Sequence, residues 1–202
     1  MAFRLKHQDQ RSKTMKTTFL TAALLLGSSY FTIATEFRSS GKVKHNLTAK
    51  RTGLPTGSIA ILIDKSDYEL YVYDEEGWYA TYPVVFGNSS LKDKVMEGDK
   101  NTPEGEFSII SKRVDNKWDR FMMLDYPNKE SWSKFNRRKA KGEIPKSASI
   151  GGGIGIHGTW PNEDYQIDRY NNWTDGCISM KNKDVEDLYS YLPVGTRITI
   201  RK

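Results

Sequence analysis

One cysteine and one histidine form the pair of residues most suited to do chemistry together. The chain has three histidines and a single cysteine. His7 and His45 lie in a polar and basic N-terminal part, so the rest of the chain holds only His157 and Cys177. A thiol needs a base to form a thiolate near neutral pH, and an imidazole within hydrogen-bonding reach is the usual base. Any Cys–His chemistry must therefore use Cys177 as nucleophile and His157 as general base and acid.

The residues around this pair fit such roles. His157 ends an apolar, glycine-rich run, residues 150–157, which predicts a strand that other backbone approaches closely. Cys177 follows Gly176, and a glycine lets the chain turn sharply there. The N–H groups of Gly176 and Cys177 could then point at a developing oxyanion. The competing interpretation is a buried cysteine and a structural histidine, each satisfied inside a core.

Other catalytic schemes fit the sequence poorly. No pair of carboxylates stands out as a glycosidase dyad, and one histidine with one cysteine makes no convincing zinc site. The glycine-rich run at residues 151–155 leads into a strand and not into a helix, unlike a phosphate-binding loop. Neither a metal nor an organic cofactor is implied.

The positive charge of the chain is confined to its N-terminal part. The formal net charge is +6 over 202 residues. Residues 1–57 carry +8 and residues 58–202 carry −2. Residues 58–202, which are numerous enough to build one hydrophobic core, are therefore nearly neutral. This near-neutral charge disfavours nucleic acid as a partner.

The N-terminal part has the pattern of an export signal. Lys13 and Lys16 precede an apolar stretch, residues 19–26, and small residues follow up to Ala34. We predict a signal peptide over residues 1–35, with Met15 as the start that gives the better signal, and a polar linker over residues 36–57. The alternative is an uncleaved anchor, so membrane contact is expected only through this leader. The predicted location is the periplasm or the cell wall.

Periodicity predicts a mostly-β domain over residues 58–202. The strand candidates are residues 59–63, 68–73, 78–86, 105–111, 120–125, 150–157 and 196–201. One helix is predicted after Met180, with Asn182 as its cap and an apolar face formed by Val185, Leu188, Tyr189 and Leu192. Residues 126–149 are basic and show no clear period. We interpret them as a long excursion that acts as a lid, with Arg137 and Arg138 facing substrate carboxylates.

The sequence around the pair resembles the L,D-transpeptidase catalytic (YkuD) domain family. The segment Ile156-His157-Gly158-Thr159 is followed, 20 residues after His157, by the cysteine of Trp173-Thr174-Asp175-Gly176-Cys177-Ile178. Further matches are Thr102-Pro103-Glu104-Gly105 upstream and Met180-Lys181-Asn182 downstream. The resemblance covers about residues 58–201. Papain-like and NlpC-like proteases are disfavoured, because their cysteine precedes their histidine.

The resemblance implies a β-sandwich or barrel with a short C-terminal helix, and a thioester mechanism. In the family the cysteine attacks the third residue of a peptidoglycan stem peptide, usually diaminopimelate, and expels D-alanine. A backbone carbonyl just after the histidine orients the ring, which corresponds to Gly158. The acyl group then passes to an amine on another stem peptide or on a surface protein; passage to water, by a carboxypeptidase, is the alternative.

Two departures from the family pattern lie beside the nucleophile. Asp175 stands where many members have His, and Ser179 stands where many have Arg. Substrate contacts are expected from these two residues, from Thr174 and from the tryptophans that bracket the motif, Trp160 and Trp173.

Overall fold

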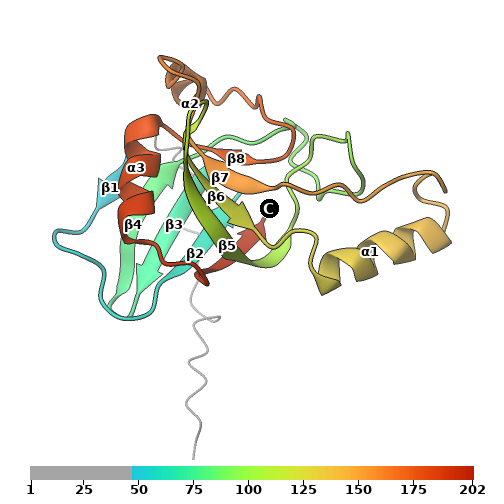
Figure 1. Ribbon diagram of the computed structural model, residues 1–202, viewed down its shortest axis with the longest axis horizontal. Coiled ribbons are helices and arrows are strands. Elements are labelled where there is room, and N and C mark those ends of the chain that lie inside the picture. The colour runs from blue at the N-terminus through green and yellow to red at the C-terminus, as the bar shows by residue number, and fades with distance from the viewer. Residues whose placement is uncertain (1–46) are drawn as a thin grey trace, which may run out of the picture. The chain divides into compact units, whose positions relative to one another are not determined.

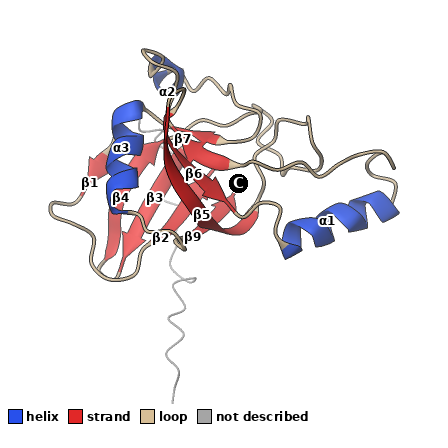
Figure 2. Ribbon diagram, in the orientation of Figure 1, coloured by secondary structure: helices blue, strands red, loops and turns tan. Residues whose placement is uncertain are grey.

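The computed structural model describes residues 47–202. The predicted signal peptide and the first part of the predicted linker lie outside the described residues. The strands form one nine-stranded sheet in the order β1-β4-β3-β2-β9-β5-β6-β7-β8. Helices are few and short (Figures 1 and 2). The prediction of a mostly-β fold is confirmed.

The first half of the sheet follows the predicted hairpins closely. The apolar run becomes β2 (Ala60–Asp64), whose side chains are almost all buried. Strands β3 (Glu69–Asp74) and β4 (Gly77–Pro83) join at a tight turn and pair antiparallel. On its other side β2 pairs parallel with the closing strand β9 (Arg197–Arg201), in which buried and exposed side chains alternate.

The second half of the sheet turns away at a long strand. In β5 (Gly105–Asp115), residues 105–108 pair with β9 and residues 109–115 pair with β6 (Asp119–Leu124). The register shifts between Ile109 and Ser111, and such irregularities bend a strand so that it can serve two differently oriented parts of a sheet. The short strands β7 (Gly155–His157) and β8 (Ile178–Ser179) complete this half.

The β8 edge is tied back to the first half. Val85, which follows β4, and Ser179 exchange two backbone hydrogen bonds of 2.8 and 2.9 Å. Hydrogen bonding therefore continues from β8 to the segment after β4, which is the arrangement expected of a sandwich or barrel. The enclosed core includes side chains from both halves, among them Leu70, Tyr82, Ile109, Ile156 and Ile198.

The C-terminal helix α3 (Asn182–Tyr191) buries the predicted apolar face against β6 and β7. Val185, Leu188 and Leu192 are buried, and Tyr189 is partly buried. The predicted cap is wrong: Lys181 takes the cap position and Asn182 is the first helical residue. The carboxamide of Asn182 instead accepts a hydrogen bond from a distant backbone N–H group, described below.

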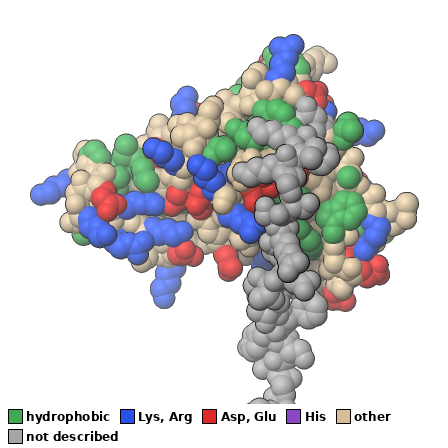
Figure 3. Space-filling view, turned by 180° about the vertical axis from the view of Figure 1, so that it is seen from behind, with side chains coloured by type: hydrophobic (Ala, Val, Ile, Leu, Met, Phe, Trp, Pro, Cys, Tyr) green, Lys and Arg blue, Asp and Glu red, His purple; other side chains and the backbone are tan. Residues whose placement is uncertain are grey.

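The basic excursion contains a helix that periodicity did not reveal. Helix α1 (Lys129–Ala140) is capped by Asn128, whose side chain accepts a hydrogen bond from the Ser131 N–H. Only Phe135 is buried along it, so no apolar period exists to be read. In Figure 1 the helix lies beyond the β5–β6 end of the sheet, and Lys and Arg side chains gather on this part in the reverse view of Figure 3.

The end of the predicted linker packs against the sheet. Strand β1 (Ala49–Lys50) pairs with β4, and Lys50 forms a 2.5 Å ion pair with Asp187 of α3. Arg51 pairs with the buried Asp74. Residues 49–51 include no large apolar side chain, and they pair through backbone hydrogen bonds and charge, which explains why the sequence pattern favoured a linker there. Within residues 47–202, no helix combines the length and hydropathy that a membrane span requires.

Candidate active site

Parallel pairing of β7 and β8 brings the candidate base and nucleophile together. Ile156 pairs with Ile178 and His157 pairs with Ser179. Cys177 directly precedes β8, at the level of Gly155. Side chains two residues apart on a strand share a face, so the side chains of His157 and Cys177 both belong to one face of this pair of strands. The 19 residues between them, which include the short helix α2 (Tyr165–Asp168), thus connect two neighbouring strands.

One backbone hydrogen bond fixes the protonation pattern of His157. Its Nδ1 lies 2.7 Å from the carbonyl oxygen of Gly158. A carbonyl oxygen only accepts, so Nδ1 carries the hydrogen and donates it. In the neutral ring Nε2 is then unprotonated and available as a base. This hydrogen bond is the contact that the orienting role expected of Gly158 requires.

Aromatic rings enclose the imidazole. Trp118, Phe121 and Trp173 have ring centroids 4.8, 5.8 and 5.6 Å from that of His157. The residue is only 2% exposed. Burial lowers the pKa of His157 to about 4, against the opposing effects of the Gly158 hydrogen bond and the charge of Asp115. The ring is therefore neutral, and able to accept a proton, at any pH well above 4.

The thiol of Cys177 is also held in its neutral form. Burial raises the pKa of Cys177, and the negative charge of Asp175 acts in the same direction. A backbone hydrogen bond from Gly155 and the positive charge of Lys94 oppose this effect. The thiol lies 3.5 Å from the carbonyl oxygen of Gly153. The thiol of Cys177 and the imidazole of His157 are thus both in their neutral forms near neutral pH.

Hydrogen bonds within the loop that precedes Cys177 stabilise its conformation. Thr174 Oγ1 donates to the Cys177 carbonyl at 2.7 Å and accepts from the Gly176 N–H at 3.2 Å. Gly176 has φ +126°, and a Cβ there would lie 2.8 Å from the carbonyl oxygen of Asn101. Glycine is therefore required for the turn and for close packing against the loop that contains Asn101.

Hydrogen bonds among Thr159, Asp164 and Asn182 hold the turn that follows His157, and these roles were not predicted from the sequence. Asn182 Oδ1 accepts the Thr159 N–H at 2.9 Å. Asp164 Oδ1 accepts from Thr159 Oγ1 at 2.7 Å and from the Asn182 N–H at 3.0 Å. The Gly158 N–H donates to the Trp118 carbonyl at 2.9 Å. Thr159 and Asn182 belong to quoted motifs, but nothing in the sequence pairs Trp118 with residues 40 positions away.

Substitution Gly158→Ala should destabilise the protein and disturb the base. An added Cβ would lie 2.2 Å from Asn182 Oδ1 and 2.7 Å from the Trp118 carbonyl oxygen. We expect a loss of about 1–3 kcal/mol in the free energy of unfolding, as for other overpacked sites, together with reduced turnover. Gly152→Ala is the matched control, because its Cβ would meet only Pro127 Cδ, at an ordinary 3.7 Å. Denaturant unfolding compares the two, and equal stability would contradict the proposed packing.

The predicted substrate residues differ in exposure. Ser179 and Thr174 are buried and bonded within the protein, and Arg138 forms a 2.6 Å ion pair with Asp93. Three others reach solvent: Trp160 is 40% exposed, Asp175 lies on the surface near Lys100, and Arg137 is exposed on α1. Trp173 is partly buried against His157.

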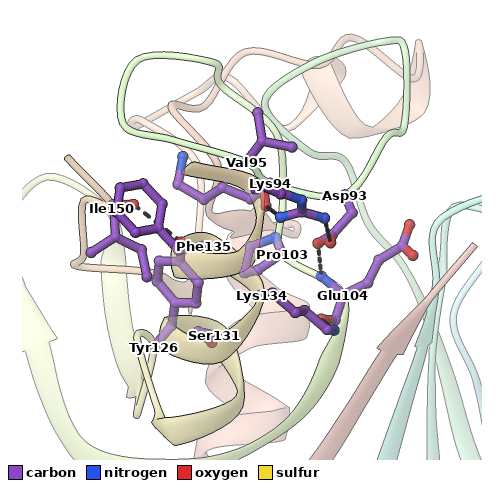
Figure 4. A pocket seen from close by; sticks show the side chains of 11 residues that line it. Asp93, Lys94, Val95, Pro103, Glu104, Tyr126, Ser131, Lys134, Phe135 and Ile150 are labelled. Carbon is purple, nitrogen blue, oxygen red and sulfur yellow. Dashed lines mark hydrogen bonds and ion pairs between the residues drawn. The ribbon is translucent and has the colours of Figure 1, made fainter. Parts of the chain in front are cut away.

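A small hollow opens beside α1, and neither His157 nor Cys177 lines it (Figure 4). Arg138 is one of the lining residues, and it donates to Asp93 and, at 2.9 Å, to the Lys94 carbonyl. Lys134 donates to the Glu104 carbonyl at 3.0 Å. Helix α1, which lies within the excursion predicted as a lid, is thus fastened to residues 93–104, the segment that packs on the loop before Cys177 through Asn101.

Known proteins with similar sequences share this domain. The family model described as the L,D-transpeptidase catalytic domain (YkuD) matches residues 58–200. A protein of Bacillus subtilis (strain 168), named "Putative L,D-transpeptidase YqjB", is 30% identical over 149 residues, which cover 71% of this chain and 72% of that protein.

Solved structures are also similar to this chain. The helical cell shape determining protein Pgp2 from Campylobacter jejuni matches with a TM-score of 0.51 and 22% identity, covering 72% of this chain and 48% of that one. Bd1075 from Bdellovibrio bacteriovorus matches with a TM-score of 0.49 and 22% identity, covering 77% and 53%. The chain therefore spans about half the length of these structures. On the family match and the Bacillus relative together, this chain belongs to the L,D-transpeptidase catalytic domain (YkuD) family.

Proposed function

We propose that this protein is a peptidoglycan L,D-transpeptidase that acts through a thioester on Cys177. The observation that carries the proposal is the hydrogen bond between His157 Nδ1 and the Gly158 carbonyl, which leaves Nε2 as a base on the face shared with the only thiol of the chain. No metal or organic cofactor is needed for this chemistry.

The first half-reaction forms the acyl-enzyme. His157 Nε2 takes the proton of the Cys177 thiol as sulfur attacks the carbonyl carbon of the diaminopimelate-type residue of a stem peptide. The carbonyl oxygen becomes an oxyanion, held by the N–H groups of Gly176 and Cys177. In the structure without substrate, the Gly176 N–H donates a hydrogen bond to the Thr174 hydroxyl. This N–H must therefore exchange that hydroxyl for the oxyanion during the reaction. Collapse expels D-alanine, whose amine receives the proton from His157.

The second half-reaction resolves the thioester with an amine. His157 removes a proton from an amine of a second stem peptide, the amine attacks the thioester carbonyl, and the cysteine sulfur leaves and regains a proton. The aromatic enclosure of His157 favours transfer over hydrolysis, because it keeps water from the base. A surface protein that offers a lysine amine would use the same steps.

Substrate contact is assigned to the exposed members of the predicted set. Trp160 offers an indole face beside Trp118, and Arg137 offers a guanidinium on α1. Asp175 sits next to the nucleophile and suits an ammonium group. Export to the periplasm or cell wall, through the leader at residues 1–35, is part of the same proposal, since the substrate polymer lies outside the cytoplasm.

The test is product analysis with purified muropeptides that carry tetrapeptide stems. We expect cross-linked dimers and released D-alanine in mass spectra. Tripeptide monomers alone, at high acceptor concentration, would replace the transfer proposal with an L,D-carboxypeptidase. If a folded, export-processed chain forms neither dimers nor tripeptides, that result would contradict the proposal of a peptidoglycan substrate.

A further inference from the structure

The side chain of Ser179 is buried beside the backbone carbonyl that contacts His157, so it does not reach a surface where substrate could bind. It is fully buried, and its hydroxyl donates to the Gly158 carbonyl at 3.3 Å. That same carbonyl accepts the hydrogen bond of His157 Nδ1 at 2.7 Å. A carbonyl oxygen has two lone pairs, so these two donors use its full capacity.

The backbone of Ser179 is fixed on both sides. It exchanges two hydrogen bonds with Val85 and is the register partner of His157 in the parallel pair β7–β8. A buried side chain on so constrained a strand has little freedom to turn elsewhere. The Ser179 hydroxyl is thus aimed at the carbonyl by the sheet itself.

We propose that Ser179 is a positioning residue for His157: its hydroxyl holds the Gly158 carbonyl in the place where that carbonyl orients the imidazole. At 3.3 Å this hydrogen bond is longer than a usual O–H···O bond, so we expect it to contribute little to the stability of the fold. This position carries arginine in many members of the family, and here a serine takes a different task. The effect of Ser179 on catalysis rests on the proposed function, whereas its contact with the Gly158 carbonyl does not.

Removing the hydroxyl should change the base in two ways. The Gly158 carbonyl loses one of its fixed bonds, so the imidazole is held less accurately and turnover falls. The carbonyl also keeps only one donor, so it attracts the Nδ1 hydrogen more strongly and favours the protonated ring. The other charges that act on His157, those of Asp115 and Arg113 on β5, are unchanged by the substitution.

The experiment compares Ser179→Ala with Ile178→Val in the full chain. Ile178 is the neighbouring buried residue of β8, with its side chain on the opposite face, so its truncation weakens the strand without touching the carbonyl. Steady-state kinetics give kcat and KM on tetrapeptide muropeptides. Nitrogen-15 spectra of the histidine rings give the tautomer and the titration of His157, which is assigned by its absence in His157→Gln.

For Ser179→Ala we expect kcat to fall about tenfold, as for other groups that orient a functional histidine, with KM within about twofold and the His157 titration moved to higher pH. Ser179→Thr, which keeps the hydroxyl, should restore both. Ile178→Val should lower only the melting temperature. Unchanged kcat and ring signals in Ser179→Ala, or the same changes in Ile178→Val, would overturn the inference. If the wild type turns over no muropeptide, the proposed function fails, and the ring spectra still decide whether Ser179 controls His157.

Discussion

Replacement of Cys177 by alanine should lower turnover of tetrapeptide muropeptides on the order of 10⁴-fold or more, as removal of an enzyme nucleophile does elsewhere. Cys177 is the only cysteine in the chain, so no second thiol can take over. The loss should appear in kcat, because the bond that the sulfur forms exists only after substrate has bound. Rates of D-alanine release measure it directly.

The fold should survive this substitution. Cys177 is partly exposed, and the Thr174 hydrogen bonds of its loop go to backbone atoms that alanine keeps. The unfolding midpoint of Cys177→Ala should thus stay close to that of the wild type. Thiol labelling provides the control, since the wild type should react at one site and the variant at none. D-alanine release by the folded variant at a near-normal rate would rule out the thioester.

His157→Gln should lower kcat by about 10²–10⁴-fold, the usual contribution of a general base. Glutamine approximates the shape of the ring, and its amide can still donate to the Gly158 carbonyl, but nothing replaces Nε2 as proton acceptor. Because burial keeps the Cys177 thiol protonated, activity depends on removal of that proton. Quenched assays of D-alanine release compare the two proteins. If kcat of the variant is within a few-fold of the wild-type value, another group must act as the base.

The pH dependence of the wild type gives an independent check on His157. The base works as the neutral ring, and burial lowers the pKa of His157 to about 4. The acidic limb of kcat/KM should therefore lie near pH 4, well below the ordinary imidazole value of about 6.5. In His157→Gln this limb should disappear. An acidic limb near 6.5 in the wild type would contradict the buried, neutral state of the ring.

The same shift affects stability. Between pH 6.5 and 4 the unfolded chain binds a proton at His157 that the folded chain does not, so folding becomes less favourable as the pH falls through this range. His157→Gln should lack this contribution.

Local patterns predicted much of the fold because local residues determine it. The apolar run of β2, the turn between β3 and β4 and the apolar face of α3 each follow from periodicity over a few residues. The boundaries of β7 were less well predicted, since only Gly155–His157 of the expected residues 150–157 forms a strand.

The parts that escaped prediction depend on distant partners. Strand β1 exists because its backbone pairs with β4, and α1 buries one residue and is fastened by charges such as Arg138 to Asp93. No local pattern encodes either. The same holds at the site: Trp118 and Phe121 reach His157 only through the register of β6 with β7. Cys177 and His157 could be proposed as nucleophile and base from the sequence because each is the sole residue of its type after residue 45.

The central claim is that the stem peptide becomes bound to Cys177 as a thioester, and rapid acid quenching during turnover tests it most directly. Full-length protein mixed with tetrapeptide muropeptide would be quenched at short times, digested and analysed by mass spectrometry. We predict an adduct equal to the substrate minus D-alanine on the peptide that contains Cys177, formed before cross-linked dimers and absent from Cys177→Ala. An adduct on any other residue, or dimers that accumulate with no adduct on Cys177 at any time, would contradict the mechanism.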